Sequence, residues 1–462
     1  MVLRVLTLRA VGMIGPVVPL IRMGSSRMRR AITRSTNSMT NARIAAASTI
    51  GNTTKVRETL KTTIRLDRSF SVAVALFLVS WLTIRAGILV GELAAPAGEK
   101  YTTHSEVQID LFKFDSDHYR DIAIHGYSYN GDPYSSPNLV FAPLFPLIIR
   151  TLAWLPGLND ISAGFAVNKL MFLLALFFLH KYLLTRFSAA TSTVILLAVG
   201  TSAGAYAFHA YYSESLMLLL LALCLFFHDR RNWLGLALAC AALGASRVAA
   251  LPMVIITAMF FGKLAWDERT NVRASAKSLG LALLCATGAV SYLAYIAIEF
   301  GNPFKLFPQI QSASWGLFHP PTPWFYVLTG RNLIDFATAA LNKGALTYVD
   351  IQTINLAWTL LAGASAFYVI AKLKGDYFSM LFAGYFGFVY VTGAASPFLI
   401  SAHRFYVLML PVFVMFADLH GWMTARMRKV SAFALTRALL LVNVEYCIIH
   451  TARFNQGVWY FF

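Results

Sequence analysis

A polar stretch between apolar runs, FDSDHYRDIAIHGYSY at 114–129, gathers side chains that can move protons. It contains three closely spaced carboxylates and two imidazoles: Asp115, Asp117, Asp121, His118 and His125. If 115–125 is helical, Asp117 and Asp121 share a face, because residues four apart are neighbours on a helix. A carboxylate whose pKa is raised by partial burial can act as a general base. Metal coordination by Asp and His, or a solvated interfacial helix, are the alternatives, and spacing alone does not choose among them.

Further charged residues stand next to apolar runs. Glu214 opens one such run, either as part of a site or as a charge favoured by the helix dipole with Ser213 as the helix cap. Arg247 lies between two apolar runs, and His403 and Arg404 precede another. A phosphate or carboxylate partner would explain each arginine, and snorkelling to water is the alternative. Together the two arginines favour an anionic ligand at the membrane surface, such as a phosphorylated lipid.

The composition identifies the elements that must position these residues. The chain has 462 residues, of which 58% are hydrophobic and 13% are charged, and its mean hydropathy is +0.61. A soluble domain is about 45–50% apolar and about 25% charged. These values exclude a disordered chain, a coiled coil and a collagen, and they predict an all-α polytopic membrane protein.

The formal charge of +18 raises the question of a nucleic-acid partner. Residues 1–69 carry thirteen Lys or Arg side chains against Glu58 and Asp67, so most of the excess lies there. We expect 1–69 to be a basic cytoplasmic tail, with a targeting segment or a start upstream of the true methionine as alternatives. No nucleic-acid-binding signature is present, so no nucleic-acid partner is expected. The four cysteines all fall within apolar runs, which predicts neither disulfides nor a metal site.

Eleven apolar segments are candidate membrane spans, of which 232–246 and 248–264 are short. They are 70–92, 162–180, 188–208, 213–228, 232–246, 248–264, 277–298, 349–371, 377–398, 403–422 and 430–450. The run 139–157 contains two prolines and Arg150, and we expect it to lie in the interface without crossing. With that assumption all later basic loops fall on the cytoplasmic side, as the positive-inside rule requires. The domain 70–462 then has its N-terminus inside, and the loop 93–158 and the polar residues named above lie outside.

Taken in order, several motifs resemble those of the phosphatidylinositol-glycan class V mannosyltransferases and their bacterial relatives. The first loop supplies Phe114-Asp115-Ser116, His118-Tyr119, Ile122-Ala123, His125-Gly126-Tyr127 and Phe141-Ala142-Pro143-Leu144-Phe145-Pro146-Leu147. Later matches are Tyr212-Ser213-Glu214-Ser215-Leu216, Ser246-Arg247, Gly301-Asn302-Pro303, Trp315-Gly316 and His403-Arg404-Phe405 through Leu410-Pro411. The resemblance covers about residues 70–425. Three positions depart from the family's pattern: Phe114 replaces the usual Trp, Ala142 replaces an aromatic residue, and Val248 replaces the usual Pro.

The resemblance implies a GT-C-like bundle of about 11 helices with interfacial helices in the first outer loop. It implies an inverting glycosyltransferase that uses a polyprenyl-phosphate sugar, typically mannose, on the non-cytoplasmic face. The motif places the catalytic base at Asp115. The spacing of the carboxylates alone could not distinguish Asp115 from Asp117. The remaining motif and outer-face residues are expected to bind substrate: Asp117, His118, Tyr119, His125, Tyr212, Glu214, Arg247, His403 and Arg404.

We expect no cofactor and no metal. We expect the partners to be the lipid bilayer, the donor lipid and a glycan or glycolipid acceptor. We expect the membrane to be a bacterial inner membrane, or that of the endoplasmic reticulum if the protein is eukaryotic. A lipid or glycan transporter or flippase is the alternative from another class, although no internal repeat is visible. Another lipid-linked glycan ligase would share the architecture and differ in its donor.

Overall fold

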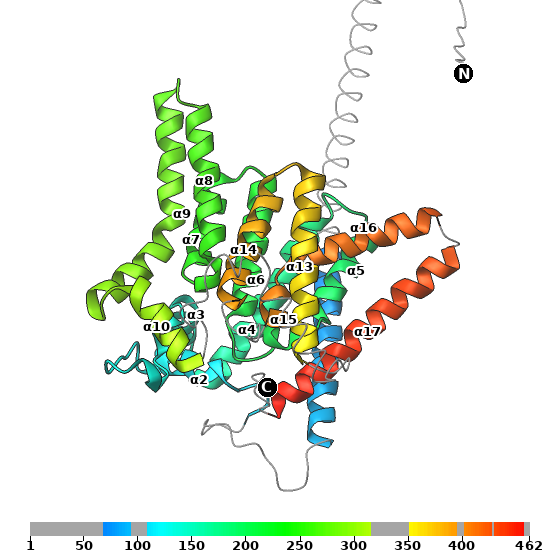
Figure 1. The fold of residues 1–462 in the computed structure, drawn as a ribbon, viewed down its shortest axis with the longest axis horizontal. Coiled ribbons are helices and arrows are strands. Elements are labelled where there is room, and N and C mark those ends of the chain that lie inside the picture. Colours follow the sequence, from blue (N-terminus) through cyan, green and yellow to red (C-terminus); the bar gives the residue numbers. More distant parts are fainter. Residues whose placement is uncertain (1–67, 94–108, 316–350, 395–401, 427–428, 457–462) are drawn as a thin grey trace, which may run out of the picture. The chain divides into compact units, whose positions relative to one another are not determined.

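The computed structural model describes residues 68–93, 109–315, 351–394, 402–426 and 429–456. These residues form helices joined by loops, with no strand among them (Figure 1). The prediction for 1–69 falls almost entirely outside this part of the chain. After a first helix, Arg68–Leu93, the elements are α2 Asp115–Ile124, η1 Pro133–Ser135, η2 Asn138–Val140, α3 Leu144–Leu152, α4 Asp160–Leu183, α5 Ala189–Gly200, η3 Ala205–Phe208, α6 Glu214–Asp229, α7 Trp233–Gly244, η4 Val248–Ala250, α8 Leu251–Asp267, α9 Val272–Glu299, α10 Pro303–Trp315, α13 Ile351–Leu373, α14 Tyr377–Ala394, α15 Ala402–Tyr406, α16 Leu410–Arg426 and α17 Lys429–Asn455.

Helix α6 lies at the centre of the bundle. It packs against α4 on one side and α7 on another, and α7 packs in turn against α9. Its sequence is apolar on every face from Leu216 to Leu225, and most of these side chains are fully buried. A helix that is hydrophobic all round is expected in the interior of a protein. Glu214 therefore begins the most enclosed helix of the fold.

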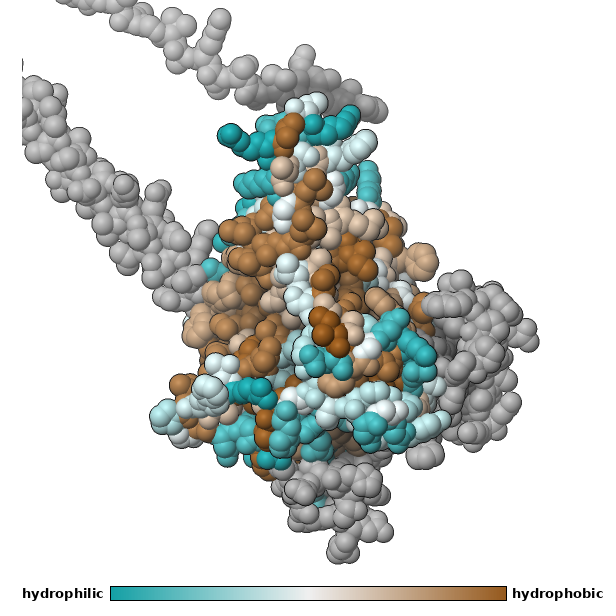
Figure 2. Space-filling model, turned by 90° about the vertical axis from the view of Figure 1, so that its left-hand side faces the viewer, coloured by the Kyte–Doolittle hydropathy of each residue, from teal (hydrophilic) through white to brown (hydrophobic). Residues whose placement is uncertain are grey.

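Six of the described helices are long and apolar enough to cross a membrane. They are Arg68–Leu93, Asp160–Leu183, Val248–Asp267, Val272–Glu299, Asn355–Leu373 and Phe433–Asn455. Figure 2 shows a hydrophobic band between two hydrophilic ends on one side of the molecule. The all-helical, multi-pass membrane architecture is thus confirmed, and the count of eleven spans stays a prediction.

Two of the expected spans are interrupted. The span expected at 188–208 ends as α5 at Gly200, and a loop containing η3 follows it. The span expected at 403–422 is divided into the five-residue α15 and the longer α16. Pro411 lies in the first turn of α16, where its missing N–H is tolerated and where it disfavours a helical residue before it. Both interruptions bring polar residues to the same end of the bundle.

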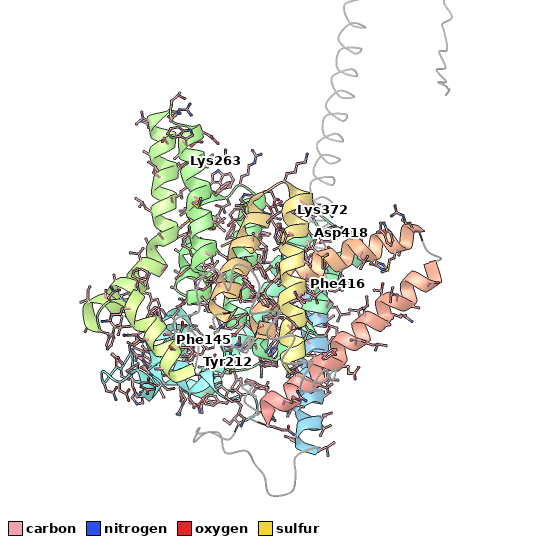
Figure 3. All side chains as sticks on the ribbon, in the orientation of Figure 1. Phe145, Tyr212, Lys263, Lys372, Phe416 and Asp418 are labelled. Atoms are coloured by element: carbon pink, nitrogen blue, oxygen red, sulfur yellow. The ribbon has the colours of Figure 1, made fainter. Side chains whose placement is uncertain are left out.

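Helix α3 has nine residues and is about 14 Å long, far short of the roughly 30 Å hydrocarbon thickness. Helix α3 alone is therefore too short to cross, and the interfacial position of the run 139–157 stays a prediction. With α2 and α10, α3 forms one end of the bundle, and the α8–α9 and α13–α14 turns lie at the other (Figure 1). Lys263 and Lys372 lie toward the second end, whereas Phe145 and Tyr212 lie toward the first (Figure 3).

Candidate active site

Four charged side chains from four separate segments meet at the end of the bundle that carries α2. Oδ2 of Asp115 lies 2.8 Å from Nη1 of Arg404. Oε1 of Glu214 lies 3.2 Å from Nε of Arg404 and 2.6 Å from Nη1 of Arg247. The result is a continuous chain of alternating charge, Asp115–Arg404–Glu214–Arg247. The side chain of Glu214 is 1% exposed, and that of Asp115, at 17%, is the most exposed of the four.

The backbone conformation before α2 orients Asp115 toward the other charged side chains of this group. Phe114, the residue before the helix, has φ 52° and ψ −112°, a conformation that is rare for a side-chain-bearing residue. Such a conformation costs about 1–3 kcal/mol and persists only where the surroundings impose it. Phe114 packs edge-on against Phe454 at 5.6 Å, which helps to hold it. Asp115 is then the first residue of α2 and faces Arg404.

The loop after α5 supplies the contact surface for α15. A Cβ on Gly204 would lie 2.6 Å from the carbonyl oxygen of His403 and 3.2 Å from Cα of Arg404. Glycine is therefore required for this close approach of the two backbones. From the same loop, the hydroxyl of Tyr206 lies 3.1 Å from Nε2 of His403, whose Nδ1 lies 2.8 Å from Oδ1 of Asn355. His403 is buried and anchors the short helix that presents Arg404, and its expected role in substrate binding stays a prediction.

Aromatic rings surround the two arginines. The guanidinium of Arg404 lies 5.0 Å from the ring centre of Tyr212, and both arginines lie within 5.2 Å of the ring of Phe405. The Tyr212 hydroxyl donates to the carbonyl of Lys113, two residues before Asp115 in the sequence. Rings attract cations through their faces and keep water away. The enclosure strengthens electrostatic interactions within the site because it lowers the local dielectric constant.

Ser213 does not cap α6 with its side chain, which contradicts the simple capping interpretation of Ser213 and Glu214. Its hydroxyl instead accepts a hydrogen bond from Arg247 at 3.4 Å and lies 2.6 Å from the hydroxyl of Tyr119. Burial raises the pKa of Tyr119 to about 12, so this phenol stays protonated at neutral pH. Burial alone would lower the pKa of Arg247, but the negative charge of Glu214, with smaller contributions from Tyr119 and Tyr385, outweighs burial and the pKa is raised. The Arg247 side chain therefore does not extend to water, as snorkelling would require.

His118 and Asp117 lie on the first turns of α2, near Asp115. The ring of His118 stacks on that of Phe141 at 4.6 Å. Burial lowers the pKa of His118 and outweighs the opposing effect of the nearby aspartates, so the imidazole is neutral at pH 7. Asp117 is half-buried on the same helix. His118 is close enough to Asp115 and Asp117 for their charges to act on it, and substrate binding by His118 and Asp117 stays a prediction.

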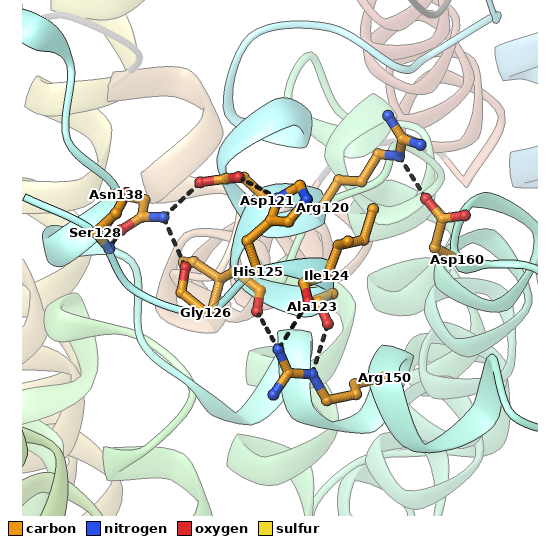
Figure 4. A network of polar contacts seen from close by, with 11 residues as sticks. Arg120, Asp121, Ala123, Ile124, His125, Gly126, Ser128, Asn138, Arg150 and Asp160 are labelled. Carbon is orange, nitrogen blue, oxygen red and sulfur yellow. Dashed lines mark hydrogen bonds and ion pairs between the residues drawn. The ribbon is translucent and has the colours of Figure 1, made fainter.

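The far end of α2 carries a separate polar network (Figure 4). Oδ1 of Asp121 lies 2.9 Å from Nδ1 of His125, and Oδ2 accepts from the amide of Asn138 at 2.6 Å. Arg150 of α3 donates to the carbonyls of Ile122, Ala123 and Ile124, which end the helix. His125 is 73% exposed and belongs to this network, so the structure does not bring it to Asp115.

Several residues near the charged chain were missed by reasoning from the sequence. Tyr206 and Asn355 come from segments whose composition gave no sign of a site, and Phe405 was matched only as a motif residue beside Arg404, without an expected role. Arg150 did give a sign, because an arginine within an apolar run requires a partner, and its partners are the α2 carbonyls.

The four cysteines are buried and free, as predicted. Across the described ranges, no group of three or more His, Cys, Asp or Glu side chains is arranged to hold a metal ion. The arrangement offers a carboxylate next to two enclosed guanidinium groups, which suits proton abstraction beside an anion. Compared with known proteins, the chain matches no protein-family model and no curated protein.

Proposed function

We propose that this protein is an inverting membrane glycosyltransferase that moves a sugar, mannose by preference, from a polyprenyl-phosphate donor to a lipid-linked or glycan acceptor on the non-cytoplasmic face. The observation that carries the proposal is the chain Asp115–Arg404–Glu214–Arg247. It joins one partly exposed carboxylate to two enclosed arginines at the end of a membrane-embedded bundle. The motif resemblance supplies the reaction type and the sugar.

In the proposed reaction Asp115 accepts the proton of the acceptor hydroxyl. The hydroxyl oxygen forms a bond to the anomeric carbon of the sugar from the face opposite the donor phosphate. The bond between the anomeric carbon and the phosphate oxygen breaks, and its electron pair leaves with the polyprenyl phosphate. Configuration at the anomeric carbon is inverted because the displacement is direct.

Arg404 and Arg247 stabilise the departing phosphate. An enclosed arginine is a strong partner for phosphate because its donors form a fixed fork and the local dielectric constant is low. Glu214 fixes the two guanidinium groups relative to each other, since its Oε1 contacts both. Preorganised charge of this kind is the largest single contribution in many enzymes.

The test is transfer of radiolabelled mannose from polyprenyl-phosphate mannose to endogenous acceptors in membranes that contain the protein. We expect Asp115→Asn to lower the rate by about 10²–10⁴-fold, the usual contribution of a general base. Asp229→Asn is the matched control, because Asp229 is an exposed carboxylate at the opposite end of α6. A wild-type transfer rate in Asp115→Asn would show that Asp115 is not the catalytic base. Absence of transfer by wild-type membranes given several polyprenyl-phosphate sugars and acceptor extracts would refute the glycosyltransferase proposal.

A further inference from the structure

The first helix and α4 run antiparallel, and each carries one cation within its apolar length, in addition to Arg68 and Lys181 near the helix ends. Phe70 packs against Phe177 at 6.2 Å and Phe77 against Phe172 at 6.1 Å, which fixes the register of the two helices. Arg85 and Lys169 are both exposed. Lys169 lies within a helix that is long and apolar enough to span a membrane, where a charged side chain is expected to have a function and a partner.

The two cationic side chains lean toward each other. Nζ of Lys169 lies 5.9 Å from the ring centre of Phe165, one turn nearer the Asp160 end of α4. The guanidinium of Arg85 lies 6.0 Å from the ring centre of Trp81, one turn nearer the Arg68 end of its helix. Because the helices are antiparallel, the two heads converge, and the charge of Arg85 acts on Lys169.

Among the described residues, one carboxylate contacts this pair of cations. Nη1 of Arg85 donates to Oδ2 of Asp110 at 3.3 Å, and both side chains stay largely exposed. Among the described residues Lys169 has no carboxylate partner. The cluster Arg85, Lys169 and Asp110 therefore carries a net charge of about +1 at neutral pH. Two converging like charges on an apolar surface are unfavourable unless an anion joins them.

On α4 the cluster lies close to one end of the helix. Phe165, over which the Lys169 ammonium lies, is five residues beyond Asp160, or about 7–8 Å along the helix axis. Asp160 belongs to the same end of the bundle as α2, because it pairs with Arg120. A long cationic side chain on this part of α4 can extend toward the headgroup region at that end.

We propose that Arg85 and Lys169 bind the phosphodiester of an anionic glycerophospholipid from the bilayer, on the outer surface of the first helix and α4. A phosphodiester carries one negative charge and complements the net charge of the cluster. Trp81 and Phe165 supply apolar surface for the acyl chains. The site is distinct from the charged chain of the candidate active site, although residues 110–115 connect the two.

Native mass spectrometry of the purified full-length protein can test this site with phosphatidylglycerol as the probe and phosphatidylcholine as the neutral comparison. We expect wild type to retain phosphatidylglycerol preferentially. Lys169→Gln and Arg85→Gln should each weaken retention about fivefold, the effect of one basic residue near a lipid surface. Lys169→Arg should retain binding. Lys305→Gln, which removes an exposed lysine from α10, is the matched control and should bind as wild type does.

Asp110→Asn is the second informative variant. If the cluster binds an anion, removal of its one carboxylate should strengthen phosphatidylglycerol retention, a gain that a purely structural role would not produce. Equal retention of the two lipids by wild type, or unchanged retention in Lys169→Gln, would overturn the proposal. Displacement of phosphatidylglycerol by equimolar polyprenyl-phosphate mannose would overturn it as well, because the occupant would then be the donor.

Discussion

Oε1 of Glu214 lies 2.6 Å from Nη1 of Arg247, in an ion pair whose side chains are 1% and 9% exposed. The same oxygen also faces Nε of Arg404. Glu214 is thus the only described carboxylate that contacts both arginines, and Asp115 extends the chain on the far side of Arg404. A charged chain so enclosed is stable only while its charges balance.

Glu214→Gln should destabilise the protein by about 3–5 kcal/mol, because it leaves two enclosed arginines with too little negative charge. The measurement is thermal or SDS-induced unfolding of the purified protein. The double variant Glu214→Gln/Arg247→Met should lose less than the sum of the two single losses, with a coupling of at least about 1 kcal/mol. Asp229→Asn, at the exposed end of α6, should unfold as wild type does. Additive losses in the double variant would contradict the ion pair.

Arg150→Gln should loosen α2, since three carbonyls at the end of that helix lose their donor (Figure 4). We expect a stability loss of about 1–2 kcal/mol. If the proposed function holds, the transfer rate should also fall, because α2 carries Asp115. Thr151→Val is the matched control, as the exposed Thr151 bonds only to its own helix. An unchanged unfolding temperature in Arg150→Gln would argue against this role.

The neutral His118 predicts a pH dependence of stability. Its pKa is lowered by burial in the folded protein, so the unfolded chain binds the proton more readily as the pH falls below about 6.5. Relative to His118→Gln, the wild type should therefore lose stability below that pH and show a constant difference above it. Unfolding temperatures of both proteins at pH 7.5 and pH 5.0 give the comparison. A difference that does not change with pH would show that His118 does not titrate in this way.

The two ends of the bundle should be on opposite sides of the membrane. Tyr134 is 76% exposed in the first loop, and the side chain of Lys263 is 75% exposed near the α8–α9 turn. In intact cells or sealed vesicles with the non-cytoplasmic face outward, a membrane-impermeant maleimide should label Tyr134→Cys and leave Lys263→Cys unlabelled. The four native cysteines are buried, which keeps the background low. The reverse labelling would place the candidate active site on the cytoplasmic side.

The sequence by itself determined the class of the fold, because long apolar runs must be helical and buried in lipid or protein. It also indicated that Asp115, Glu214, Arg247 and Arg404 needed partners, since an isolated charge next to an apolar run is costly. Residues 188–208 and 403–422 were apolar enough to predict continuous spans. The close packing of Gly204 against His403, which no local pattern encodes, accompanies the breaks in both.

Only the tertiary structure decided which charges meet. Asp115, Asp117 and Asp121 are alike in type and spacing, yet Asp115 faces Arg404 whereas Asp121 faces Asn138. The helix period fixes which residues share a face, but the partner of each residue comes from another segment, which is near in the sequence for Asn138 and far for Arg404. The pairing therefore depends on how α2, α6 and α15 pack, and packing is a property of the whole bundle and not of any one motif.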